Sequence, residues 1–324
     1  MTDALKRRIG LGLLTAYGVG VMVGAGIYVL VGAVAADAGV WAPLSFLVAG
    51  IIAAPTAMSY AEFTTRLPEA AGEAVFVAKG LGVDALGVFV GLGIVAAGAV
   101  SAAAVLRGGT GYLTSVVDLP FGITLVVMGG LLVSVAIIGV LESLTLAAIF
   151  TAIEVLGLAF VIYAGTTAEP VQAFQAPPAI VWSGVAAGAV LAFFAFIGFE
   201  DIVNMAEEVR DPERTLPRAI LLSLLITSLL YALVSYAAVR AVPLDKLSVS
   251  EQPLALVWSE ARGGSASFLA LIAVAAALNG VLAQIVMASR LIYGAARDVP
   301  ALGFLATVNA RFGTPGRTTA LATA

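Results

Sequence analysis

The sequence predicts an all-α integral membrane protein. Of its 324 residues, 61% are hydrophobic and 11% are charged, and the mean hydropathy is +1.08. These values lie outside the range of soluble globular domains. Apolar runs of roughly 18 to 27 residues recur along the chain, and each is long enough to cross about 30 Å of hydrocarbon as a helix. We therefore expect about eight transmembrane helices.

The apolar runs are separated by short polar or proline-rich loops. They are expected at residues 9–35, 41–61, 85–106, 122–140, 144–165, 181–205, 219–239 and 268–289. Basic residues precede the first run, as in a signal peptide, but the run is too long and lacks a convincing cleavage site, so it is predicted to be a retained signal-anchor helix. After the last run, residues 294–318 are expected to form a loop, and residues 319–324 resemble the start of another apolar segment.

The basic residues predict the orientation, because cytoplasmic loops carry an excess of Lys and Arg. With the N-terminus inside, twelve of the 16 basic residues fall in cytoplasmic segments. They are Lys6, Arg7, Arg8, Arg66, Lys79, Arg210, Arg214, Arg218, Arg290, Arg297, Arg311 and Arg317. The four outside are Arg107, Arg240, Lys246 and Arg262. The bias predicts a multi-pass protein of the cell membrane with a cytoplasmic N-terminus.

Two glycines, Gly24 and Gly26, interrupt the first run within the segment Gly24-Ala25-Gly26-Ile27. A helix in lipid can be broken only where protein or a watery cavity receives the freed backbone groups. The half-helix that starts near Ile27 would point its N-terminal amides at an anion such as a carboxylate. The alternative is a stripe of small residues that lets neighbouring helices approach closely.

The sixth run carries a second break, in the segment Phe196-Ile197-Gly198-Phe199-Glu200-Asp201. A charge at the bilayer centre costs about 2.5–3.5 kcal/mol, so these two carboxylates should face a cavity or a partner. The alternative is a helix that ends at Gly198 and leaves both acids at the interface. Two broken segments are typical of a secondary transporter with internal repeats.

Glu154 is the most isolated charge, because it lies in the middle of the fifth run with no basic residue within a helical turn. An unpaired carboxylate in a low-dielectric interior suits a proton carrier. The alternative is a neutral carboxyl group that is hydrogen-bonded across a helix interface. Weaker polar signals in other runs are Ser101, Asn279 and Gln284.

Aromatic side chains crowd the second break and could enclose a substrate, although lipid-facing or core packing is the commoner role. They are Phe193, Phe194, Phe196 and Phe199. The chain has no Cys and no His. No disulfide, thiol nucleophile or metal site is therefore expected. We expect no enzyme activity and no cofactor, apart from a coupling proton or sodium ion.

Taken in order, these motifs resemble the amino acid–polyamine–organocation superfamily, in particular the prokaryotic amino acid permeases. The resemblance runs from Ile9 to the end of the chain. Its motifs are Gly18-Val19-Gly20-Val21-Met22-Val23-Gly24-Ala25-Gly26-Ile27-Tyr28, Ser59-Tyr60-Ala61-Glu62, Leu67-Pro68, Ala71-Gly72, Phe196-Ile197-Gly198-Phe199-Glu200, Ala206-Glu207-Glu208-Val209, Asp211-Pro212, Leu216-Pro217-Arg218-Ala219-Ile220, Ser289-Arg290 and Ala296-Arg297-Asp298.

The resemblance implies a leucine-transporter-like fold of two inverted five-helix repeats with broken helices 1 and 6. It places the first repeat at residues 1–167 and an incomplete second repeat at residues 168–324. It also implies that the amides of Gly24, Ala25 and Gly26 hold a substrate carboxylate. By the same resemblance, carbonyl groups around Phe194, Ala195 and Ile197 are expected to hold the ammonium group, and Phe194 is expected to act as a gate.

Two departures from the family pattern affect these expectations. Some proton-coupled members carry a helix-five Lys where this chain has Glu154, which makes Glu154 the candidate for coupling to a proton or a cation. The family usually has twelve helices, so the chain is expected to be either a C-terminally truncated piece or an unusual short form.

The resulting prediction is a secondary active transporter that moves amino acids by alternating access, by proton coupling or by exchange. Its expected partners are a small-molecule amino acid and the lipid bilayer, with no nucleic acid; a homo-oligomer is left open. The alternatives are a polyamine or other organocation transporter of the same fold, which Glu200 or Asp201 in the cavity would favour, and a non-transporting membrane scaffold or sensor.

Overall fold

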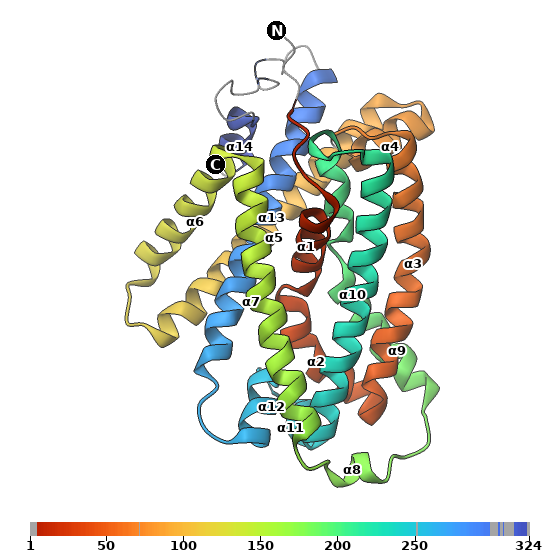
Figure 1. Cartoon of the computed structure of the whole chain (residues 1–324), viewed down its shortest axis with the longest axis vertical. Coiled ribbons are helices and arrows are strands. Elements are labelled where there is room, and N and C mark those ends of the chain that lie inside the picture. The colour runs from red at the N-terminus through yellow and green to blue at the C-terminus, as the bar shows by residue number, and fades with distance from the viewer. Residues whose placement is uncertain are drawn as a thin grey trace.

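The structure is a computed structural model that describes residues 5–70, 72–250, 252–298, 304, 307 and 314–322. Within these residues the chain is helical, with no β-strand beyond one isolated bridge between Ile9 and Val209. The longer elements, shown in Figure 1, are α1 (Leu11–Val23), α2 (Ala25–Ala38), α3 (Ala42–Arg66), α4 (Gly72–Leu81), α5 (Asp84–Val116), α6 (Phe121–Ile138), α7 (Val140–Thr167), α9 (Trp182–Phe193), α10 (Pro212–Ala241), α12 (Pro253–Arg262) and α13 (Ser267–Asp298). The shorter ones are α8 (Gln172–Gln175), α11 (Leu244–Leu247), α14 (Gly316–Ala322) and three 3₁₀ helices, η1 (Gly39–Trp41), η2 (Phe194–Phe196) and η3 (Phe199–Glu208).

Seven stretches of the described residues are long and apolar enough to cross a membrane. One of them, Gly26–Arg66, contains both α2 and α3. In Figure 1, α1 and α2 follow one another along the long axis of the molecule, and α3 returns beside them. Counting α1 with α2 as one crossing and α3 as the next gives the eight helices that the apolar runs predict. The predicted all-α membrane fold class is confirmed.

The outer faces of the helices carry large apolar side chains. Phe89 and Val100 on α5 and Val126 on α6 are each 73% exposed. A soluble monomer rarely exposes so many large apolar groups, whereas lipid is a suitable surrounding for them. The core lies between the helices and includes fully buried residues from α1, α3 and α10, among them Leu14, Phe46 and Tyr231.

Small residues let the helices pack closely, as expected where apolar side chains gain little by leaving lipid. A Cβ atom on Gly165 of α7 would lie 2.5 Å from the carbonyl oxygen of Ala237 on α10. A Cβ atom on Gly109 of α5 would lie 2.6 Å from the Cβ of Ala277 on α13. In the first run, where a stripe of small residues is the alternative interpretation, a Cβ atom on Gly18 would collide with Cδ1 of Ile202. One on Gly32 would lie 2.7 Å from the carbonyl oxygen of Leu247.

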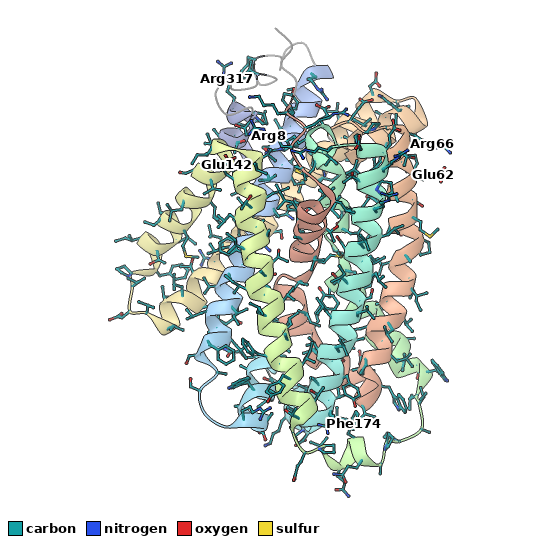
Figure 2. All side chains as sticks on the ribbon, viewed as in Figure 1. Arg8, Glu62, Arg66, Glu142, Phe174 and Arg317 are labelled. Carbon is teal, nitrogen blue, oxygen red and sulfur yellow. The ribbon has the colours of Figure 1, made fainter. Side chains whose placement is uncertain are left out.

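Charged residues gather at the end of the molecule that carries both termini. Arg8, Arg66, Glu142 and Arg317 lie at this end in Figure 2, whereas Phe174 lies at the other end. The helices α11 and α12, which contain Lys246 and Arg262, also lie at the far end in Figure 1. Arg8, Arg66 and Arg317 are thus separated along the long axis from Lys246 and Arg262, and Arg311 lies outside the described residues.

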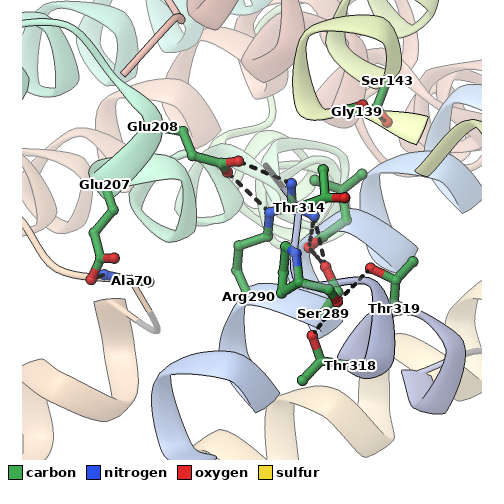
Figure 3. Close-up of polar contacts among 12 residues, drawn as sticks. Ala70, Gly139, Ser143, Glu207, Glu208, Ser289, Arg290, Thr314, Thr318 and Thr319 are labelled. Carbon is green, nitrogen blue, oxygen red and sulfur yellow. Dashed lines mark hydrogen bonds and ion pairs between the residues drawn. The ribbon is translucent and has the colours of Figure 1, made fainter. Parts of the chain in front are cut away.

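A buried ion pair joins η3 to α13 at the charged end. The guanidinium of Arg290 donates to both carboxylate oxygens of Glu208, from Nε at 3.0 Å and from Nη2 at 3.2 Å, and both side chains are buried (Figure 3). Arg290 Nη1 also donates to Ser289 Oγ at 2.7 Å. Nearby, Arg297 pairs with Glu207, which also accepts from the amide of Ala70. These pairs join motifs that lie 82 and 90 residues apart in the sequence.

We expect Glu208→Ala to lower the free energy of unfolding by about 3–5 kcal/mol, because the Arg290 charge stays buried without its partner. Denaturant titration of the purified protein in mixed micelles measures this change. The matched control is Glu62→Ala, which breaks the exposed pair with Arg66 and should cost no more than about 1 kcal/mol. Equal effects of the two substitutions would contradict a structural role for the buried pair.

Candidate functional site

The first apolar run is interrupted at Gly24. The helix α1 ends at Val23 and α2 begins at Ala25, with φ −30° and ψ −154° at Gly24, outside the helical region. The first turn of α2 contains no acidic residue, and no side chain caps its N-terminus. Unpaired amides at a helix N-terminus attract an anion.

The sixth run is interrupted between η2 and η3. Ile197 is extended, with φ −62° and ψ 132°, and Gly198 has φ +128°, a backbone conformation that favours glycine. A Cβ atom at Gly198 would also lie 2.7 Å from Cγ1 of Val21 in α1. The carboxylate of Glu200 accepts a hydrogen bond from the Gly198 amide at 2.8 Å. Glu200 therefore stabilises the break itself.

The two interruptions lie side by side. A Cβ atom on Gly26 would lie 3.2 Å from Cα and 3.4 Å from Cβ of Ala195 in η2. Because Gly198 also approaches Val21, the start of α2 and the end of α1 both face the second break. The glycines at positions 26 and 198 permit this close approach of two backbones.

Tyr231 of α10 links the two breaks. Its hydroxyl group lies 2.6 Å from the carbonyl oxygen of Met22 and 2.8 Å from that of Ala195, and the residue is fully buried. Its ring makes edge contacts with Phe46 and Phe196, with centroids 5.7 Å and 5.1 Å apart. One phenol thus lies within hydrogen-bond distance of carbonyl groups from both interrupted segments, and its single O–H is shared between them.

The predicted site residues are divided between the interior and the surface. Ile27, Ala195, Phe196 and Gly198 are buried, and Gly24, Gly26 and Glu200 are half-buried. Ala25 begins α2, and only its backbone is described. Phe194 is 60% exposed and Ile197 is 50% exposed. The aromatic cluster is therefore split, since Phe196 and Phe199 point into the core whereas Phe194 does not.

Glu154 lies in a polar contact between α7, α13 and α1. Its carboxyl group is fully buried and accepts a hydrogen bond from Asn279 Nδ2 at 2.9 Å. Asn279 also contacts Thr151 Oγ1 at 3.2 Å, and Thr151 Oγ1 lies 3.1 Å from the carbonyl oxygen of Ala16. The bond from Asn279 crosses a helix interface, as expected if Glu154 is a hydrogen-bonded carboxyl group. A role for Glu154 in coupling stays a prediction.

Two polar atoms in this region have no hydrogen-bond partner, Glu154 Oε2 and the Tyr28 hydroxyl, and both are buried. Tyr28 is near enough to Glu154 to feel its charge. It belongs to α2, one turn beyond the Gly24 break. Of the other polar residues noted in the apolar runs, Gln284 donates a hydrogen bond to Asp201 at 3.3 Å. Ser101 is exposed.

A cavity of about 280 Å³ opens beside Tyr28, between α2, α5 and α13. Its wall is formed by small and apolar residues with two tyrosines, and none of the lining residues is charged. The main ones are Tyr28, Val29, Gly108, Gly109, Tyr112 and Ala276. An adjoining smaller cavity shares Tyr28 and Tyr112 and reaches Gln252 and Leu254.

Comparison with known proteins decides the family. A family model described as "Amino acid permease" matches residues 9–323. This chain belongs to the amino acid permease family. The permease is 34% identical over 325 residues to an uncharacterized transporter of Mycobacterium tuberculosis, covering 97% of this chain and 71% of that protein.

Two further relatives of the permease carry substrate names. It is 29% identical over 337 residues to a branched-chain amino acid permease of Bacillus subtilis, covering 96% of this chain and 72% of the relative. It is 31% identical over 320 residues to a chloroplastic cationic amino acid transporter of Arabidopsis thaliana, covering 91% and 56%. The family and the apolar helices together make this chain a multi-pass membrane protein.

Sequence reasoning missed Tyr231, which contacts both breaks of the permease. The residue stands in a predicted transmembrane run that also contains Tyr236, and the sequence offers no signal that separates the two tyrosines. The importance of that hydroxyl depends on two carbonyl groups, those of Met22 and Ala195, 209 and 36 residues away. Thr151 was missed for the same reason, since its hydroxyl reaches α1.

We expect Tyr231→Phe to lower the free energy of unfolding by about 1–3 kcal/mol, because it leaves buried carbonyl oxygens without their donor. Denaturant titration in mixed micelles measures the loss. The control is Tyr236→Phe on the same helix, where the side chain is 39% exposed and the change should stay within about 0.5 kcal/mol. If Tyr231→Phe is as stable as the parent, the hydroxyl does not hold the breaks.

Proposed function

We propose that the permease is a secondary transporter that binds an amino acid at the two helix breaks and moves it by alternating access. The observation that carries this proposal is the contact between the breaks, Gly26 against Ala195, with Tyr231 bound to both. Irregular backbone at membrane depth is typical of a site that lines a substrate or ion pathway. The family and the named relatives support an amino acid as the substrate.

In this proposal the uncapped amides at Gly24, Ala25 and Gly26 bind the substrate carboxylate. Carbonyl groups of η2, around Phe194, Ala195 and Ile197, bind its ammonium group. The Ala195 carbonyl already accepts from Tyr231, but a carbonyl oxygen has a second lone pair that can accept from an ammonium group. Both substrate charges are thereby met by backbone dipoles, and no charged side chain is required.

The cavity beside Tyr28 is suited to the substrate's side chain. Tyr28 and Val29 follow Gly24 by four and five residues, which places the cavity roughly 6–8 Å from the break along the helix axis. A side chain can extend over that distance from a carboxylate held at the N-terminus of α2. Because the lining carries no charge, an apolar side chain fits it better than a cationic one. This favours a neutral, branched amino acid over a polyamine.

The end of the molecule with both termini is assigned to the cytoplasm, because most of the basic residues belong to that end. The membrane is accordingly the cell membrane, with the N-terminus inside. Coupling is assigned to Glu154, whose Oε2 lacks a partner beside Tyr28. A proton or a sodium ion would suit this carboxylate, and exchange without an ion is the alternative.

Substituting Gly26→Val should abolish amino acid binding, a loss of about a hundredfold or more in affinity, because the added side chain collides with Ala195. Binding of radiolabelled leucine to the purified protein measures the effect, and uptake into proteoliposomes confirms it. Gly12→Val is the control, since a Cβ atom there meets nothing within 4 Å. Unchanged binding in Gly26→Val would remove the breaks as the substrate site.

Filling the cavity should alter selectivity. A Cβ atom on Gly108 meets nothing within 4 Å, so Gly108→Leu directs its side chain into open space at the cavity wall. We expect leucine to bind about tenfold more weakly, equal to about 1.4 kcal/mol, whereas alanine binds nearly as before. The control is Gly111→Leu, which is also unobstructed and does not line this cavity. Equal losses for leucine and alanine would mean that the cavity does not receive the side chain.

A further inference from the structure

A second polar site lies in the protein interior, apart from the apolar cavity and between the second break and the end of the molecule that carries both termini. It is formed by Tyr17 of α1, Glu73 of α4, and Asp201 and Asn204 of η3, which are all buried. A Cβ atom on Gly72 would collide with Val203, so the N-terminus of α4 lies directly on η3. Glu73 follows Gly72 and is enclosed by this contact.

Several buried polar atoms of this site lack a hydrogen-bond partner. They are Glu73 Oε2, the Tyr17 hydroxyl, and both Oδ1 and Nδ2 of Asn204. The Asn204 side chain faces Glu73 without a hydrogen bond of normal geometry. Each unpaired buried group costs about 1–3 kcal/mol, and native proteins rarely leave several together without a ligand. Asn204 is 1% exposed, so bulk water does not meet this requirement.

The charges around Glu73 are negative and lack a cation of their own. From η3 it faces Glu200 and Asp201, from α1 Tyr17 and from α3 Tyr60. The basic groups of the neighbouring elements have other acidic partners. Arg290 and Arg297 of α13 pair with Glu208 and Glu207, and Lys79 pairs with Glu69 on the exposed side of α4, beside Asp84 of α5.

The chemistry of this cluster favours a proton as its ligand. The described residues include no group of carboxylates arranged to hold a metal ion. A proton needs no coordination shell, and buried carboxylates with no cation favour the neutral acid. Burial raises the pKa of Glu73 to about 7; hydrogen bonding to its own amide opposes this, the charge of Glu200 adds to it, and the nearby Asn204 amide opposes it.

We propose that Glu73, facing Asn204 and the carboxyl groups of Glu200 and Asp201, is a proton-binding site whose occupancy controls the docking of α4 on η3. When Glu73 is protonated, α4 stays docked and the site remains buried. When it ionises, the charge favours water, and α4 moves away from η3. Because Glu200 holds the Gly198 amide, this movement acts on the second break. The site does not require a bound substrate.

The direction of the pH effect follows from linkage. A carboxyl group whose pKa is higher in the docked state than in water stabilises docking fully below its ordinary value, 4.5. That contribution is lost as the pH rises through about 7. For one such group, the undocked population increases about tenfold between pH 6 and 8 and then levels off.

The absence of cysteine allows a single thiol probe in the full chain. Val203→Cys places a thiol beneath Gly72, where maleimide reaches it only when α4 undocks. The labelling rate is measured from pH 6 to 8 in V203C and in V203C/E73Q, and the two rates are divided. Thiol ionisation affects both rates equally and cancels. We expect this ratio to rise about tenfold. The matched control is V203C/E69Q, which lacks an exposed carboxylate outside the cluster. The rate of V203C divided by the rate of V203C/E69Q should stay constant over the same pH range.

A flat ratio for V203C over V203C/E73Q would overturn the proposal. So would a change in the ratio when sodium chloride replaces choline chloride at constant pH, because the ligand would then be a metal cation. If V203C/E73Q does not fold, V203C/E200Q provides the test, because the Glu200 charge raises the pKa of Glu73 and a glutamine keeps an acceptor for the Gly198 amide. Removing one neighbouring charge should move the midpoint of the labelling curve to lower pH, and an unmoved midpoint would also overturn the proposal.

Discussion

The hydroxyl group of Tyr231 contacts the carbonyl groups of Met22 and Ala195, and these belong to the two segments in which the membrane helices are interrupted. Freed backbone groups inside a membrane protein must find partners within the protein, because lipid offers none. The phenol on helix α10 contributes one donor, which the carbonyl groups of the two segments share. Its position is fixed in turn by the rings of Phe46 and Phe196. The geometry of the proposed substrate site depends on this interaction.

The proposed substrate site and the proposed proton sites are separated in this arrangement. The proposed substrate site combines backbone dipoles at the breaks with an uncharged cavity beside Tyr28. The buried carboxyl groups lie elsewhere, Glu154 between α7 and α13, and Glu73 with Asp201 between α4 and η3. Each carboxyl region is connected to a break, the first through Tyr28 and the second through the Glu200 contact with Gly198. In the proposed mechanism, protonation would influence the breaks without placing a charge against an apolar substrate.

Local patterns in the sequence predicted the membrane class, the apolar runs and the polarity of the two ends, because each depends on composition over one helix length. The motif residues Glu208 and Arg290 were recognised as family features, but their ion pair joins positions 82 residues apart. Glu154 and Asn279 were both noticed, yet nothing in their spacing places them in contact. The spacing of residues in the sequence could not predict that Phe194 is exposed, because its exposure depends on how η2 turns between α2 and α3.

The most direct test of the central claim compares the thermal stability of the purified chain with leucine, with leucine amide and with N-acetyl-leucine. A ligand that binds only the folded protein stabilises it by about 2.7 kcal/mol at a hundredfold excess over Kd. The account predicts a clear upward shift in Tm with leucine and a much smaller one with either derivative, since each lacks one of the two charges that the breaks bind. No shift with leucine in a cooperatively melting protein, or equal shifts with all three compounds, would contradict it.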